Sequence, residues 1–335
     1  MKVTLKQIAD SLGLSVATVS KVLNNKDYDI SEPTKKMVLD KAKELNYTVN
    51  EIAKSMKTNR TKTLGIIIPD IKNSFFTDMA TAIEEEAIKN GYSIFLSNSY
   101  EKLEREIYQI KTLISKRADG IIIAATNERD SIREKKILID RPIVSIDRNL
   151  NYNNVIASID SDNFGGAYCA TYYLIKLGHS NIMYISGPVN TNTTKERKNG
   201  YIKALKDSNI KINKQFIRYG NYTVEFGYNT IMKNPLPNNI SAILCGNDLI
   251  AVGVMKALKQ KGISVPNEIN IIGIDNTDIS AVVSPSLTTI SQPSGEIGKL
   301  AVKTLINYFN GEKYDKYVRL NQKLIVREST CIYKL

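Results

Sequence analysis

Several apolar runs of the sequence end in polar side chains that could bind a ligand. These side chains are carboxylates, amides and one arginine: Asp70, Asp147, Arg148, Asn247, Asp248, Asp275 and Asn276. In a parallel α/β sheet, ligands bind outside the carboxyl ends of the strands, so these groups are expected to face one cleft. Sugar hydroxyls both donate and accept hydrogen bonds, so this mixture suits a hydroxyl-rich ligand. Each carboxylate could instead cap the helix that follows it, and the pattern leaves both interpretations open for a single residue.

Few residues of this chain could support metal or nucleophilic chemistry. His179 is the only histidine, which excludes a metal site with several histidine ligands. His179 lies between an expected helix and an expected strand, a position that favours a structural role over a place in a Ser-His-Asp triad. Cys169, Cys245 and Cys331 have no C-x-x-C spacing, which is typical of reduced thiols in a cytosolic protein. No P-loop, dinucleotide fingerprint or nucleophile elbow occurs. We expect a cytoplasmic protein that is not an enzyme and has no metal or cofactor.

The charge of the chain favours an anionic partner. The 335 residues carry a formal charge of +12, although surface lysines alone could supply much of it. Residues 1–62 hold 12 Lys and Arg against 7 Asp and Glu, so basic charge is densest there, as in a phosphate-binding module. No apolar run reaches the length of a membrane span, and the N-terminus lacks a signal-peptide hydrophobic region.

The first residues of the chain predict two short helices joined by a tight turn. Thr4 and Gln7 have the spacing of a capping box, Gly13 suits the turn, and Ser15 can cap the second helix. This pattern matches a helix-turn-helix, whose second helix lies in the DNA major groove, although any small helical hairpin has the same spacing. Residues 31–34 are expected to open a third helix with proline in its first turn.

From Lys62 onward, apolar runs alternate with amphipathic segments, which predicts a doubly wound α/β architecture. The expected strands are 64–68, 92–96, 120–124, 143–146, 182–186, 215–219, 241–245 and 269–274. The expected helices are 75–89, 101–116, 129–138, 163–177, 194–208, 224–232, 248–261 and 295–309.

Residues 3–70, from VTLKQIADSLGLSVATVSKVLNN to ELNYTVNEIAKSMKTNRTKTLGIIIPD, resemble the N-terminal part of the lactose-repressor (LacI/GalR) family of bacterial transcription regulators. The similarity continues along nearly the whole chain. It implies an α/β fold with a helix-turn-helix domain and a periplasmic-binding-protein-like core of two doubly wound parallel-sheet halves. The implied domains are a headpiece at 1–48, a hinge helix and linker at 49–61, and a core at 62–335. The first half of the core is expected at about 62–158 and 290–318, and the second half at about 159–289 and 319–335.

The resemblance implies which residues contact operator DNA. Val16, Ala17 and Lys21 are expected to discriminate bases, whereas Lys54, Lys57 and Arg60 contact phosphates. Met56 stands where the family usually has the leucine that enters the minor groove, and it keeps that wedge apolar. The complete expected set is Thr4, Ser15, Val16, Ala17, Thr18, Ser20, Lys21, Asn24, Tyr47, Asn50, Ala53, Lys54, Met56 and Lys57.

The resemblance also extends the expected effector site. Phe75 and Phe76 match the family's effector-contacting aromatic residues, and Arg197 matches its effector arginine. Thr191 replaces a charged residue that some relatives carry, which favours a neutral sugar. The complete expected set is Asp70, Phe75, Phe76, Asp147, Arg148, Thr191, Thr193, Arg197, Tyr222, Asn247, Asp248 and Asp275.

These residues predict a homodimeric repressor of carbohydrate utilisation genes that binds operator DNA and a small sugar effector. One alternative is a catabolite-control regulator with a phosphoprotein corepressor, whose basic partner-binding helix is weakly echoed by Lys299 and Lys303. A sugar-binding transport protein is another, but it would have no use for residues 1–60. An α/β enzyme would need a catalytic constellation, and the sequence contains none of the recognised ones. The sequence does not identify the sugar.

Overall fold

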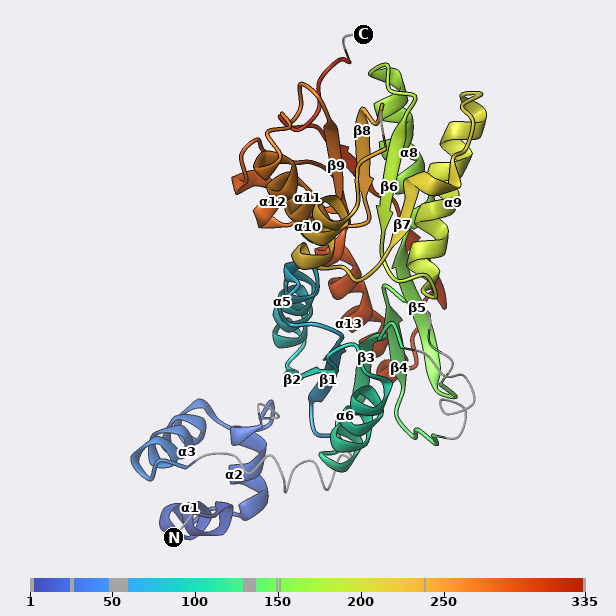
Figure 1. Cartoon of the computed structure of the whole chain (residues 1–335). Coiled ribbons are helices and arrows are strands. Elements are labelled where there is room, and N and C mark those ends of the chain that lie inside the picture. The colour runs from blue at the N-terminus through green and yellow to red at the C-terminus, as the bar shows by residue number, and fades with distance from the viewer. Residues whose placement is uncertain are drawn as a thin grey trace. The chain divides into compact units, whose positions relative to one another are not determined.

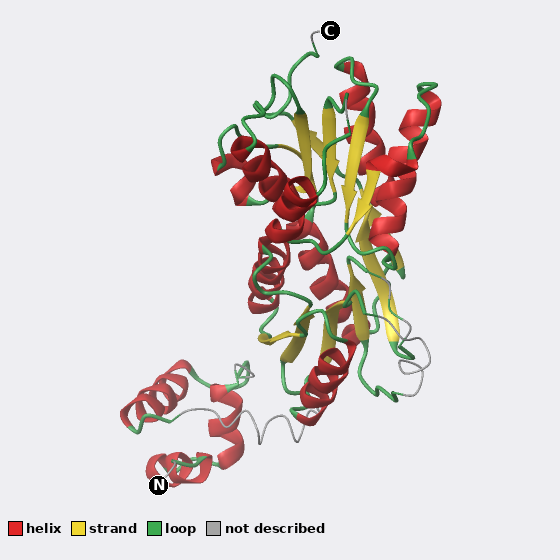
Figure 2. Ribbon diagram, in the orientation of Figure 1, coloured by secondary structure: helices red, strands yellow, loops and turns green. Residues whose placement is uncertain are grey.

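The computed structural model describes residues 3–24, 27–47, 60–128, 137–148, 150, 152–237 and 239–333 (Figures 1 and 2). The chain forms two compact units, Met1–Thr61 and Lys62–Leu335, which we call the headpiece and the core. Most of the expected helix at 129–138 and the whole expected hinge helix, Asn50–Lys57, lie outside the described residues.

The described part of the headpiece is a small three-helix unit. Its helices are α1 (Leu5–Leu12), α2 (Val16–Leu23) and α3 (Glu32–Glu44). The predicted capping box of Thr4 and Gln7 is confirmed, as are the left-handed Gly13 at φ 62° and the cap of Ser15 on Thr18 N. The inward faces bury Ile8, Val19, Val22 and Val38 in one apolar cluster. Because α2 begins at a defined cap and buries this face, its other face is available to solvent.

The first half of the core is a parallel six-stranded sheet in the order β11-β5-β4-β3-β1-β2. The strands are β1 (Thr63–Ile68), β2 (Ser93–Asn98), β3 (Gly120–Ala124), β4 (Ile143–Ile146), β5 (Val155–Ser161) and β11 (Tyr317–Leu320). Helices α5 (Ser74–Lys89) and α13 (Ser294–Asn310) pack on one face of this sheet, and α6 (Leu103–Ser115) packs on the other. The inner strands β1, β3 and β4 are mainly apolar because helices bury both faces of the sheet.

The second half repeats this three-layer arrangement around the sheet β12-β10-β9-β8-β6-β7. Its strands are β6 (Ile182–Ser186), β7 (Ile217–Tyr219), β8 (Ala242–Cys245), β9 (Asn270–Asp275), β10 (Thr288–Ser291) and the antiparallel β12 (Lys323–Ile325). Helices α8 (Asn163–Lys176) and α9 (Asn192–Asp207) cover one face, and α10 (Val224–Lys233) and α11 (Asp248–Gln260) cover the other. The short α12 (Asp278–Val282) follows β9, and a 3-10 turn (Lys214–Phe216) precedes β7.

The chain crosses between the halves at three places, and all three differ by a few residues from the expected boundaries, the last because β11 pairs with β5 as far as Leu320 and not only to residue 318. We expected the first half to end at residue 158, but β5 continues to Ser161 because it pairs in parallel with both β4 and β11. We expected residues 290–291 in the first half, but β10 pairs with β9 to Ser291. The crossings therefore fall at 162, at 292–293 and at 321–322. The sequence pattern did not predict β5, β11, β12 or α12.

Within the described residues, no helix combines the length and hydrophobicity that a membrane span requires.

Candidate functional site

The first wall of the cleft between the halves comes from the end of β4 and from the start of α5. Asp147, the residue after β4, has a positive φ of 61°, which an ordinary side chain adopts only under constraint. Arg148 Nη1 donates to both carboxylate oxygens of Glu101 at 3.2 Å and to the carbonyl of Ala125 at 2.7 Å. Its guanidinium lies 5.4 Å from the ring centroid of Phe76. These contacts hold a cation and an aromatic face at one wall.

Helix α5 begins at this wall and orients two aromatic rings. Asn73 caps the helix by accepting a hydrogen bond from Phe75 N at 3.2 Å. The rings of Phe75 and Phe76 meet edge to face with centroids 5.1 Å apart. Both rings are almost completely buried, so they offer a fixed apolar surface.

The opposite wall comes from the ends of β8 and β9. Asn247 caps α11 through its Oδ1, which accepts from Ile250 N at 2.9 Å. Asp275 ends β9 with a φ of 123°, a conformation that residues other than glycine rarely adopt. Gln292 Nε2 donates to Asp275 Oδ1 at 2.6 Å from the second crossing between the halves. A strained carboxylate at each wall is typical of a functional site.

Arg197 brings a second cation into the cleft from α9. Its Nε donates to Asn163 Oδ1 at 2.8 Å, and its Nη1 donates to the carbonyl of Gly246 at 2.6 Å. Nη2 lies 3.9 Å from Asp275 Oδ1, and the side chain is 3% exposed. The ring of Tyr222 lies 5.9 Å from this guanidinium.

These side chains form two adjoining chambers in the core. The inner chamber has a free volume of only about 20 Å³ and is lined by Asn73, Phe75, Phe76, Asp147, Arg148, Thr193, Arg197, Tyr222, Asn247, Asp275 and Gln292. The outer chamber has a volume of about 500 Å³ and is lined by Asp70, Asn73, Phe76, Glu101, Lys102, Asn127, Glu128, Arg148, Pro188, Val189, Asn190, Asn221, Tyr222 and Thr223. Asn73, Phe76, Arg148 and Tyr222 line both, so the chambers are neighbours that share one wall.

The inner chamber holds buried donors that lack hydrogen-bond partners among the described residues. They are Arg148 Nε, which forms an ion pair with Asp147 Oδ2 at 3.4 Å but no hydrogen bond, and Asn247 Nδ2. A buried donor without an acceptor costs about 1–3 kcal/mol, so folded proteins rarely leave one except where a ligand or water binds. The acceptors that remain nearby are the carboxylates of Asp147 and Asp275.

Burial also changes the ionisation of these carboxyl groups. Desolvation raises the pKa of Asp147, and the guanidinium groups of Arg148 and Arg197 oppose that rise. Desolvation raises the pKa of Asp275 to about 8, again against the opposing effect of Arg197. Hydroxyl groups of a ligand could donate to either carboxylate and accept from the orphan donors.

Two family profiles match the chain over regions that together include both units. The family described as "Bacterial regulatory proteins, lacI family" matches residues 4–50, and "Periplasmic binding proteins and sugar binding domain of LacI family" matches residues 61–324. The chain belongs to the LacI family. As predicted from its sequence, this LacI-family protein combines a helix-turn-helix unit with a core of two doubly wound halves. It is a DNA-binding transcriptional repressor.

Individual relatives agree with this assignment. The LacI-family protein is 35% identical to the HTH-type transcriptional repressor PurR of Pasteurella multocida strain Pm70, over 97% of this chain and 98% of that one. It is similar to the crystal structure of the lac repressor dimer bound to operator and the anti-inducer ONPF, with a TM-score of 0.86, 25% identity, and coverage of 99% and 100%. A LacI-type regulator from Alkaliphilus metalliredigens QYMF, complexed with D-xylulofuranose, has a TM-score of 0.70, 32% identity, and coverage of 80% and 99%.

The structure of this LacI-family protein does not bring every expected effector residue into the inner chamber. Asp70 lines only the outer chamber. Thr191 lines neither chamber, because its hydroxyl caps α9 by accepting from Thr194 N and donates to the carbonyl of Pro188. Asp248 also lines neither chamber, because its carboxylate is fully buried and accepts from Thr277 and Thr289. Thr191 therefore gives no information about the ligand's charge.

Sequence reasoning missed several residues that line the cleft. Asn73 could have been found as the cap that precedes α5, since an asparagine before an apolar periodic segment is a common helix start. Gln292 had no such signal, because it lies in a crossing segment rather than at a strand end. The other unexpected lining residues are Glu101, Lys102, Asn127, Glu128, Pro188, Val189, Asn190, Asn221 and Thr223.

In the headpiece, the expected DNA-reading residues lie at the start and on the outer face of α2. Val16 is 44% exposed, and Ala17 and Lys21 are also exposed. The Lys21 ammonium group forms an ion pair with Asp29, which DNA would have to displace. Asn24 Nδ2 is bonded to the carbonyl of Ser20 at the end of the helix. Of the remaining expected residues, Asn50, Ala53, Lys54, Met56 and Lys57 lie outside the described residues.

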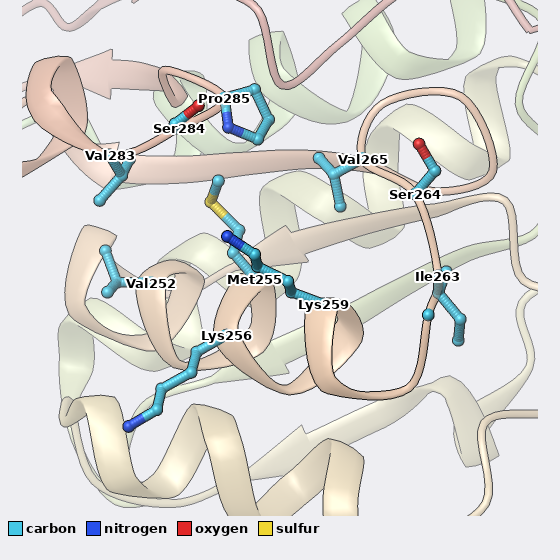
Figure 3. A pocket seen from close by; sticks show the side chains of 11 residues that line it. Val252, Met255, Lys256, Lys259, Ile263, Ser264, Val265, Val283, Ser284 and Pro285 are labelled. Carbon is cyan, nitrogen blue, oxygen red and sulfur yellow. The ribbon is translucent and has the colours of Figure 1, made fainter.

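A large, mainly apolar cavity lies elsewhere in the second half, beside α11 (Figure 3). Its volume is about 530 Å³, and its lining includes Val252 and Met255 on α11 together with Val265, Val283 and Pro285 on neighbouring loops. Helix α11 also contributes Lys256 and Lys259 to the lining. Carboxylates and amides are absent from the residues that line it, so it has none of the polar chemistry of the cleft.

Proposed function

We propose that this protein represses carbohydrate utilisation genes as a homodimer whose affinity for operator DNA changes when a neutral monosaccharide binds between the core halves. The observation that carries the proposal is that each wall of the inner chamber combines a buried donor with an acidic side chain, Arg148 Nε with Asp147 on one wall and Asn247 Nδ2 with Asp275 on the other. A polyol matches this arrangement because each hydroxyl group can accept from one side and donate to the other.

A single sugar ring suits the inner chamber better than a flat aromatic ligand or an extended one. Phe75 and Phe76 offer apolar ring faces, and polar groups surround them. The relative from Alkaliphilus metalliredigens, which is complexed with D-xylulofuranose, supports a five- or six-carbon sugar. The free volume of about 20 Å³ holds about one water molecule, so the halves must separate to admit a sugar.

A hydrogen-bond network links the chamber to the three crossings between the halves. Ser161 Oγ donates to Gln292 Oε1 at 2.6 Å, and Gln322 Nε2 donates to Ser161 Oγ at 2.9 Å and to Gln292 Oε1 at 3.2 Å. Gln292 also donates to Asp275 inside the chamber. A sugar that binds one arrangement of the halves better than another would increase the population of that arrangement and move the residues of this network. The affinity of the dimer for DNA would then change to the value that belongs to that arrangement.

We propose that α2 reads the operator through Val16 and Ala17, which are exposed in the first turn of the helix. Exchanging these two residues should change which sequence the protein selects from random DNA, because side chains in the major groove discriminate bases. Lys36→Gln on the exposed face of α3 serves as a control for general loss of charge. Equal weakening of all DNA sequences by the exchange would contradict this assignment.

The homodimer is proposed from the lac repressor dimer that this chain resembles and from two apolar surfaces. The first is the cavity beside α11, and the second is the edge strand β2, where Phe95 and Leu96 are 45% and 42% exposed. Monomeric proteins rarely expose large apolar patches, and an unpaired edge strand favours association. We propose that a second copy of this chain covers both surfaces.

The central experiment measures DNA binding and sugar binding with the same full-length protein. An operator is first selected from random DNA, and its binding is followed by fluorescence anisotropy during titration with D-xylulose, D-ribose, D-fructose and D-glucose. At least one sugar should shift the DNA-binding midpoint and raise the melting temperature. A sugar that stabilises the protein without shifting DNA binding would contradict the control of DNA affinity, and a panel without binding would contradict the ligand class.

A further inference from the structure

The charges around the outer chamber differ in sign from the charge of the whole protein. The chain has a net charge of +12, yet the outer chamber is lined by three carboxylates, Asp70, Glu101 and Glu128, against the two cations Lys102 and Arg148. Arg148 is already paired with Glu101 and bonded to the carbonyl of Ala125. Among the described contacts, Lys102 is therefore the only cation of this lining that has no ion pair or hydrogen bond of its side chain.

Three backbone amide groups beside this chamber are already occupied by the protein's own carboxylate oxygens. Leu103 N, at the start of α6, donates to Glu128 Oε2 at 3.3 Å, and Asn127 N donates to Glu101 Oε2 at 2.6 Å. Lys72 N donates to Asp70 Oδ1 at 2.9 Å. Helix starts and free amide groups are the usual binding sites for phosphate, so their occupation by carboxylates makes this entrance unfavourable for an anion.

From this arrangement we infer that Asp70, Glu101 and Glu128 are specificity-determining residues that reject phosphorylated sugars, so that the effector is the free sugar. The inference rests on the proposed function. A phosphate ester carries a charge of about −1.5 to −2 at neutral pH. The outer chamber adjoins the inner one, with which it shares four lining residues, so a substituent that projects from the inner chamber on this side meets these carboxylates. The repressor therefore reports the concentration of the free sugar and not that of its phosphate ester.

The test compares free sugars with their phosphate esters by isothermal titration calorimetry on the full-length protein. The probes are D-xylulose and D-ribose and the corresponding 5-phosphates. We expect the free sugar to bind at least tenfold more tightly than its ester. Raising the salt concentration from 50 to 500 mM should narrow this ratio severalfold, because salt screens charge repulsion but does not change steric exclusion.

The matched variants separate the role of the carboxylates from general effects. Asp70→Asn combined with Glu128→Gln removes two charges and keeps an oxygen acceptor for Lys72 N and Leu103 N. It should improve ester binding severalfold relative to free-sugar binding, so that the ratio of the two affinities narrows. The control combines Glu84→Gln with Glu85→Gln on the exposed face of α5, outside both chambers, and should leave the ratio unchanged.

The possible failures point to different conclusions. Ester binding as tight as that of the free sugar, a ratio that does not depend on salt, or identical behaviour of the two double variants would each overturn the inference and leave the proposed function in place. Absence of binding by every probe, in either form, would instead overturn the proposed ligand class, and the inference would fall with it.

Discussion

The two principal cavities of the core have opposite properties. The cleft between the halves has an inner chamber of about 20 Å³ that contains two carboxylates and two guanidinium groups. The cavity beside α11 is far larger, about 530 Å³, and is lined mainly by aliphatic side chains. Buried charges without complete partners are costly and persist where they bind something, whereas an open apolar surface costs little until another surface covers it. The outer chamber of the cleft has nearly the same volume as the apolar cavity, about 500 Å³, so the chemistry of the lining distinguishes the two cavities and volume does not.

The largest expected effect comes from a charge introduced into the apolar cavity. Val252→Glu places a carboxylate on a half-buried position of α11, where a second copy would desolvate it. Each buried unpaired charge costs several kcal/mol, and the two-fold symmetry of a dimer places two such charges in one interface. The dissociation constant of the dimer should therefore increase about a thousandfold or more. Sedimentation velocity measures this, and sugar binding to the core should remain.

The matched control for this variant is Leu138→Glu. Leu138 is 89% exposed and lies outside the cavity, so its replacement should leave the dimer intact. If Val252→Glu remains dimeric at micromolar concentration, the cavity beside α11 is not the surface that a second copy covers.

The second largest effect concerns Arg197, a buried cation that lines the inner chamber and has no buried counterpart in the lining of the apolar cavity. Arg197→Ala would remove the guanidinium group that donates to Asn163 Oδ1 and to the carbonyl of Gly246 and would leave Asp275 without its neighbouring cation, so it would weaken the fold. Arg197→Lys keeps the charge but loses the fixed fork of donors, so sugar affinity should fall about tenfold to a hundredfold without loss of the dimer. Calorimetry measures the affinity, and Arg218→Lys outside the cleft is the control. Unchanged affinity would place the sugar elsewhere.

The third effect is a dependence of stability on pH that the apolar cavity cannot produce. The folded pKa of Asp275 is raised to about 8, above its unfolded value near 3.9, so the folded state retains a proton that the unfolded state has lost. Stability should therefore fall as pH rises from 6 to 8, by about 1.4 kcal/mol per pH unit. Asp248, whose pKa is raised to about 6, acts mainly below this window.

Asp275→Asn should flatten this part of the profile, because the amide keeps the shape of the carboxyl group and does not titrate. Urea unfolding at several pH values measures the difference. Parallel profiles for the variant and the unmodified protein would show that another group binds the proton.

The smallest effect concerns the network that joins the cleft to the crossings. Gln322→Leu removes the bonds to Ser161 and Gln292 and also a buried oxygen, Gln322 Oε1, that has no partner among the described residues. Sugar affinity should change less than threefold, while the shift that the sugar produces in DNA affinity should fall severalfold. Anisotropy titrations with and without sugar measure both. An unchanged shift would exclude this network from the coupling.

The candidate cleft could be predicted from the sequence only in part. Asp147 and Asp248 carry the same signal, an aspartate just after an apolar strand, but only Asp147 lines the chamber. The carboxylate of Asp248 instead accepts hydrogen bonds from Thr277 and Thr289, which are 29 and 41 residues away along the chain. Long-range partners of this kind leave no trace in the local pattern, so the pattern could not separate the two carboxylates.

Local chemistry determined most of the helices and inner strands, although not β5, β11, β12 or α12. The caps at Thr4 and Ser15, the left-handed Gly13 and the alternation of apolar runs with amphipathic segments depend on residues a few positions apart, so the sequence alone predicted them. Tertiary structure decided where the chain crosses between the halves, because parallel strand pairing depends on segments more than a hundred residues apart, as for β5 and β11. Those crossings bring Gln292 to Asp275 and close the chamber, and no local preference specifies that contact.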